Sequence, residues 1–63
     1  MYTYFVALNY QNLEGYSGIG NSEISVNYRI TSIDHIRHIS KALESDQGVK
    51  NVIITNFILL REE

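Results

Sequence analysis

The segment from Gly15 to Asn21, GYSGIGN, is the part of the sequence whose composition comes nearest to a ligand-binding loop. Its glycines have the spacing G-x-x-G-x-G, whereas a dinucleotide-binding loop has G-x-G-x-x-G and leads into a helix whose amino end faces the pyrophosphate. The residues that follow alternate between apolar and polar, which predicts a strand instead. The glycines therefore indicate a wide turn that needs positive φ angles, not a phosphate site.

The surrounding residues 11–22 are rich in Gly, Asn and Ser and are predicted to form a long loop between two strands. Long loops in compact domains are often contact surfaces. We therefore regard Tyr16, Ile19 and Asn21 as candidate partner-binding residues.

His35 and His38 are three residues apart on a predicted helix and could share a metal ion. Zinc normally takes at least three protein ligands, and no third donor is indicated by its spacing. No Ser-His-Asp order or pair of carboxylates suggests catalysis either. We expect a protein without metal, cofactor or enzymatic activity, in which the two histidines lie on the solvent side of the helix and can contact a partner.

The chain contains five tyrosines, and aromatic side chains on a sheet can stack single-stranded bases. Such a surface normally has basic residues around it, but here seven acidic residues outnumber five basic ones, and the formal net charge is −2. Core packing is the better interpretation for most of the tyrosines. Binding of single-stranded nucleic acid remains the alternative function.

Two segments alternate in hydropathy as strands do, residues 2–10 and residues 23–30. A third segment, residues 49–60, is rich in β-branched residues and is also predicted to be a strand. Because it is the most apolar segment, we expect it to occupy the centre of the sheet.

Between the second and third strands, apolar residues recur with the period of an amphipathic helix, from Ile33 to Leu43. Thr31 or Ser32 can cap its first turn, and Gly48 can end it in the left-handed conformation. The fold class is thus α+β, a single ββαβ domain over residues 1–63, with a mainly antiparallel three-stranded sheet and one helix packed on one face.

Simple alternation gives the last strand two apolar faces. One face would carry Val52, Ile54, Ile58 and Leu60, and the other Ile53, Phe57 and Leu59. A single helix can cover only one face of the sheet, so we expect another copy of the chain to cover the second set face to face, or to pair with a strand edge and form a continuous sheet. The predicted dimer interface consists of Phe5, Ile53, Phe57 and Leu59.

The sequence has no cysteine, no apolar run long enough to span a membrane, and no basic amino-terminal signal. We therefore expect a cytoplasmic protein.

Several short motifs resemble those of small phage and prophage proteins. They are Tyr4-Phe5-Val6, Gly18-Ile19-Gly20-Asn21, Ser32-Ile33-Asp34 and Asn56-Phe57-Ile58-Leu59-Leu60. In size and layout the chain is similar to the Hachiman anti-defence family, whose members block a bacterial immune system. The resemblance implies stoichiometric binding to a host defence protein, in the host cytoplasm and as a dimer, but it assigns no functional residue.

Overall fold

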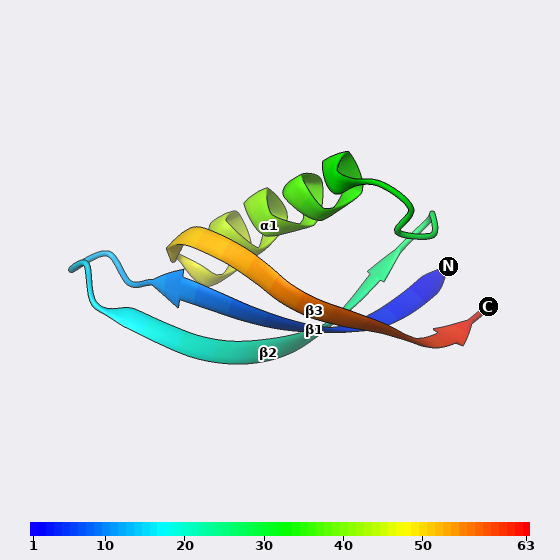
Figure 1. Cartoon of the computed structure of the whole chain (residues 1–63), viewed down its shortest axis with the longest axis horizontal. Helices are drawn as coiled ribbons and strands as arrows, with labels where there is room; N and C mark the ends of the chain where they lie inside the picture. The colour runs from blue at the N-terminus through cyan, green and yellow to red at the C-terminus, as the bar shows by residue number, and fades with distance from the viewer.

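The computed structural model describes all 63 residues as one three-stranded sheet with one helix on a single face, which confirms the predicted α+β class (Figure 1). The elements are β1 (Tyr2–Gln11), β2 (Ser17–Val26), α1 (Ile33–Gln47) and β3 (Lys50–Glu62). Both β2 and β3 pair with β1 in antiparallel fashion, so the strand order is β2-β1-β3. The chain termini lie side by side, where the backbone N–H of Glu63 donates to the Met1 carbonyl at 2.8 Å.

The central strand is β1, so the prediction that the last strand lies in the middle of the sheet was wrong. A short turn places β2 against one edge of β1, and α1 then carries the chain across to the other edge, where β3 pairs. Three alternate residues of β1 form the middle of the core, and Val6 is fully buried. The central position of β1 therefore follows from how the turn and the helix connect the strands, and not from how apolar the last strand is.

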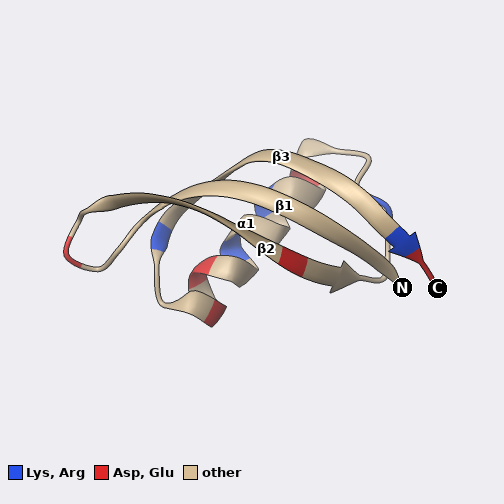
Figure 2. Cartoon of the chain, turned by 90° about the horizontal axis from the view of Figure 1, so that it is seen from below, with Lys and Arg blue, Asp and Glu red and all other residues tan.

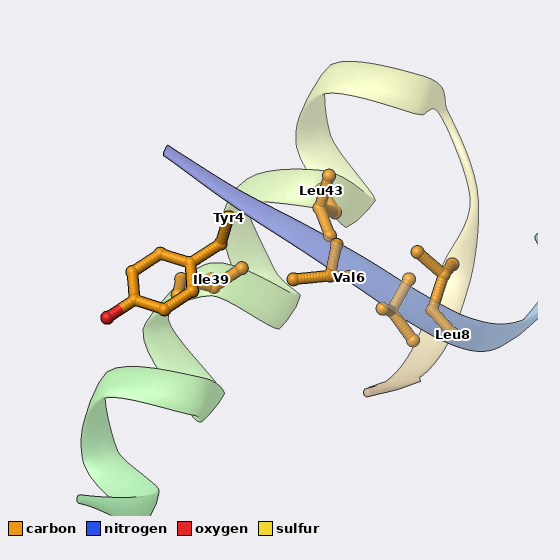
Figure 3. Close-up of a cluster of buried hydrophobic side chains, with 6 residues drawn as sticks. Tyr4, Val6, Leu8, Ile39 and Leu43 are labelled. Carbon is orange, nitrogen blue, oxygen red and sulfur yellow. The ribbon is translucent and has the colours of Figure 1, made fainter. Parts of the chain in front are cut away.

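The helix begins and ends where the sequence predicts. The Ser32 side chain accepts a hydrogen bond from the backbone N–H of His35 at 3.3 Å, and Gly48 has φ +66°. One side of α1 packs on β1 and β3, and this contact forms the hydrophobic core (Figure 3). The buried apolar side chains are Tyr4, Val6, Leu8, Ile39, Leu43 and Val52. The helix lacks the length and apolar character needed to cross a bilayer.

The predicted long loop over residues 11–22 is mostly strand, which is a second correction. Only residues 12–16 form the turn, where Asn12 Oδ1 accepts the N–H groups of Glu14 and Tyr16. Gly18 lies within β2, beneath the ring of Tyr10, and a Cβ atom there would come within 2.6 Å of the ring carbon Cζ. This glycine serves close packing against an aromatic ring rather than a turn. The predicted second strand, residues 23–30, is displaced accordingly, because β2 ends at Val26.

A bulge in β3 changes which of its side chains face the helix. Ile54 lies opposite Leu8 and Asn56 lies opposite Ala7, so Thr55 is an extra residue in the ladder. The Thr55 hydroxyl donates to the Ala7 carbonyl at 3.2 Å. Residues from Asn56 to Leu59 are therefore shifted by one place relative to simple alternation, and a second extra residue, Leu60, restores the phase at Arg61.

Because of the shift, Phe57 and Leu59 lie on the helix side of the sheet and pack against the core. The Phe57 ring meets Tyr4 edge to face, with centroids 5.9 Å apart. Ile58 takes the position opposite Phe5 on the other face. The prediction that Phe57 and Leu59 share the uncovered face with Phe5 and Ile53 was therefore wrong for these two residues.

Candidate interaction surface

The face of the sheet away from α1 has no cover, and we call it the open face. Directly opposed residues of antiparallel strands point to the same side, so the register defines this face as four rows running across the three strands. In the order β2, β1, β3 the rows are Ile19, Asn9, Ile53; Asn21, Ala7, Asn56; Glu23, Phe5, Ile58; and Ser25, Thr3, Arg61.

Three isoleucines on the open face stand largely in solvent. The exposed fraction is 85% for Ile19, 62% for Ile53 and 52% for Ile58. Phe5 and Ala7 lie between them on β1 and are half-buried. Figure 2, which views the sheet from this side, shows that β1 carries no charge. The centre of the open face is thus an apolar surface interrupted by amide side chains, with the exposed Glu23 of β2 beside Phe5.

The row nearest the chain termini is polar and ordered. Thr3 and Ser25 share a hydrogen bond between their hydroxyls at 3.0 Å, and Arg61 lies 3.5 Å from the carboxylate of Glu23. Thr3 is buried between its neighbours on β2 and β3. This row bounds the apolar surface on one side.

At the opposite end of the open face, a hollow of about 430 Å³ lies between the first row and the turn. Its lining includes Asn9, Gln11, Asn51 and the two isoleucines Ile19 and Ile53, and contains no acidic residue, basic residue or histidine. Asn51 has φ +53° and its side-chain amide donates to Gln11 Oε1 at 2.7 Å. Amides and aliphatic side chains together suit a contact with another protein better than acid–base chemistry.

The predicted partner-binding residues are divided between two sides of the molecule. Ile19 and Asn21 lie on the open face, as parts of β2 and not of a loop. Tyr16 is exposed in the turn. His35 and His38 lie on α1, on the other side of the sheet. Of these residues, the structure therefore brings together only Ile19 and Asn21.

The two histidines differ in their surroundings. His35 Nδ1 accepts the backbone N–H of Thr31 at 3.1 Å, and its ring stacks on Tyr28 with centroids 4.4 Å apart. His38 is exposed and lines a groove between α1 and β2. No group of three or more potential metal ligands is gathered anywhere in the chain.

The tyrosines mostly lie on the helix side of the sheet or beside α1. Tyr4 is buried, and its hydroxyl accepts the backbone N–H of Ile30 at 2.9 Å. Tyr2, Tyr10 and Tyr28 are half-buried. Only Tyr16 is largely exposed, so the tyrosines form no row on which successive bases could stack.

Sequence reasoning missed Ile58 and the groove beside β2. The polar pair Thr55-Asn56 inside an otherwise apolar segment is the signal that could have indicated the bulge, and with it the position of Ile58. The groove depends on how far α1 extends across the sheet, and no local pattern reports this.

Comparison of the chain with protein-family models, with curated proteins and with solved structures gave no match.

Proposed function

We propose that this protein is a small, non-catalytic binding protein that acts as a homodimer in the host cytoplasm and blocks a bacterial defence protein by stoichiometric binding, as phage anti-defence proteins do. The observation that carries the proposal is the open face, with three largely exposed isoleucines on a rigid sheet. Apolar surface gathered on one face of a small protein marks a contact site more often than scattered exposed residues do.

The free energy available from burying the three isoleucines suits a protein partner. Fully burying a large aliphatic side chain is worth about 1.5–3 kcal/mol, and the exposed parts of the three isoleucines amount to about two side chains, so their burial contributes roughly 3–6 kcal/mol before the cost of association. The strands that hold them are both paired with β1, β2 without interruption and β3 with three register shifts, so little ordering is required on binding. Amides between the isoleucines can supply hydrogen bonds that give specificity.

The surroundings of the titratable groups support a non-catalytic role. The hollow on the open face has no acid, base or histidine in its lining, and one of the two histidines is engaged in holding the start of α1. The arrangement of the tyrosines does not favour the alternative of nucleic-acid binding. A protein-binding role uses the aliphatic and amide side chains of the open face, which Glu23 and Arg61 border at one end.

A homodimer that leaves the open face free would present two copies of it to the defence protein. If two copies packed face to face, they would bury the very surface that carries the proposal. We therefore place the partner protein on the open face and the second copy elsewhere.

The proposal can be tested in bacteria that carry the Hachiman defence system and are challenged with phage. Expression of the protein should restore phage plating, and Ile53→Asp should abolish the restoration, because a buried unpaired carboxylate is costly at an interface. Lys41→Asp on the solvent side of α1 is the matched control and should behave as the wild type. Equal restoration by Ile53→Asp and wild type, at equal protein levels, would remove the open face from the proposal.

A further inference from the structure

We propose that the free edge of β2 pairs with the same edge of a second copy, in antiparallel fashion, about a two-fold axis at Ser22. The result is one continuous six-stranded sheet with both helices on one side and both open faces on the other. This inference rests on the proposed function, which requires a homodimer with the open face unobstructed.

The edge formed by β3 is poorly suited to pairing. Its register with β1 shifts at three places, so its outer edge is bent and irregular. Glu44 Oε2 accepts the backbone N–H of Val52 at 3.0 Å, and Asn56 Oδ1 accepts that of Phe57 at 2.9 Å. Lys50 and Arg61 place charges near the two ends of the strand. Bulges, charged residues and occupied amides are the devices by which proteins prevent association through an edge strand.

The edge formed by β2 has no bulge and no occupied amide, and it carries a single charged residue. All ten of its residues, from Ser17 to Val26, pair with β1 in one uninterrupted register. No side chain accepts a hydrogen bond from any of its backbone amides, and Glu23 is its only charged residue. A long, regular edge of this kind presents a row of unpaired donors and acceptors to another strand.

The helix side of β2 is also incompletely covered. A groove of about 350 Å³ lies between β2 and α1, with Ile24, Val26 and Ala42 in its lining. Ile24 and Val26 pack against the core yet remain half-exposed. A strand added at this edge would extend the sheet beside the groove and bury both side chains further.

Charge disfavours the two registers next to the proposed one. With Ser22 on the axis, Glu23 lies opposite Asn21 of the second copy, whose side-chain amide can donate to the carboxylate. Moving the axis to Glu23 places the two Glu23 carboxylates directly opposite each other, which is destabilising. Moving it to Asn21 places Glu23 opposite an isoleucine.

The same register matches large side chains with small ones. The helix-side residues of β2 run from Gly18 and Gly20 through Ser22 to Ile24 and Val26. A two-fold axis at Ser22 sets Ile24 opposite Gly20 of the second copy and Val26 opposite Gly18. The Tyr10 ring, which lies over Gly18, then packs beside a β-branched side chain across the interface.

The extent of the contact favours a second copy as the occupant. Residues 18–26 of both chains pair, a contact ~30 Å long at about 3.3 Å per residue, in a molecule whose longest dimension is 38 Å. The contact uses nearly the whole of β2 in both chains.

The test uses cysteine substitution, since the chain has no cysteine of its own and any disulfide must join two copies. Directly opposed residues of antiparallel strands have Cα atoms about 4.5–5.5 Å apart, which is within the range that a disulfide can bridge. Under mild oxidation Ser22→Cys should form a disulfide-linked dimer in most of the protein. Thr55→Cys, exposed on β3, is the matched control and should form only traces.

The outcomes separate this inference from the proposed function. Wild-type protein that is dimeric by light scattering, with cross-linking by Thr55→Cys and none by Ser22→Cys, would overturn pairing through β2 and leave the proposed homodimer standing. Stronger cross-linking by Asn21→Cys than by Ser22→Cys would overturn the register. A wild-type monomer at ~100 μM would remove both dimers, while the phage-plating assay would still decide whether the open face binds a defence protein. Circular dichroism of the reduced variants verifies that each is folded.

Discussion

On the helix side of the sheet, Tyr4, Val6 and Leu8 are each less than a tenth exposed, whereas Ile19, Ile53 and Ile58 on the open face are each more than half exposed. The first set belongs to the central strand β1 and the second to the outer strands β2 and β3 of the same sheet. The difference lies in cover, because α1 packs on one side only. Stability should therefore depend on the first set, and binding on the second.

The largest effect on stability is expected from Leu43→Ala, at the centre of the contact between α1 and the sheet. The side chain is 5% exposed, and its truncation should leave a cavity and lower the free energy of unfolding by about 2–5 kcal/mol. Urea denaturation followed by circular dichroism, at one fixed protein concentration, measures the change. A loss of this size can unfold so small a domain at 25 °C, in which case Leu43→Val serves as the milder variant.

Ile53→Ala is the matched control on the open face, since it also truncates a large aliphatic side chain. Because Ile53 is mostly exposed, we expect a loss of less than about 1 kcal/mol. Losses of equal size at Leu43 and Ile53 would break the distinction between the two faces.

A smaller effect is expected from Phe57→Ala, and the comparison with Ile58→Ala tests the bulge at Thr55. Phe57 packs on Tyr4 beneath the helix, so its truncation should cost about 2–3 kcal/mol. Its neighbour Ile58 projects from the open face and should cost less than about 1 kcal/mol. The same denaturation measurement applies. If Ile58→Ala proved the more damaging, β3 would follow simple alternation and the bulge would be absent.

The sequence was sufficient to predict those features of the helix and strands that depend on contacts within a few residues. The Ser32 side chain and Gly48 define the two ends of α1 through contacts within a few residues, and both were readable from the sequence. The alternation of Tyr2, Tyr4, Val6 and Leu8 likewise fixed one face of β1. The fold class follows from the order of these elements.

Features that depend on contacts between distant residues were not predictable in this way. The bulge at Thr55 depends on the pairing of β3 with β1, so the faces of Phe57, Ile58 and Leu59 were assigned incorrectly. Of the four residues predicted for the uncovered face, Phe5 and Ile53 are there. The role of Gly18 was obscured for the same reason, because the ring that it accommodates belongs to the neighbouring strand.

Gly18→Ala is expected to cost less than the substitutions at Leu43 and Phe57, and it tests that contact directly. A Cβ atom at Gly18 would lie 2.6 Å from Cζ and 2.7 Å from the hydroxyl oxygen of Tyr10, so the ring must move, at a cost of about 1–3 kcal/mol. At Gly20 the nearest ring atom would lie at 3.5 Å, an ordinary contact, and Gly20→Ala should leave stability unchanged or raise it slightly by restricting the unfolded chain. Adding Tyr10→Ala to Gly18→Ala should make the glycine substitution nearly neutral, since the obstructing ring is gone. A full loss at Gly18 in the absence of the ring would show that the strand backbone, and not the Tyr10 contact, requires the glycine.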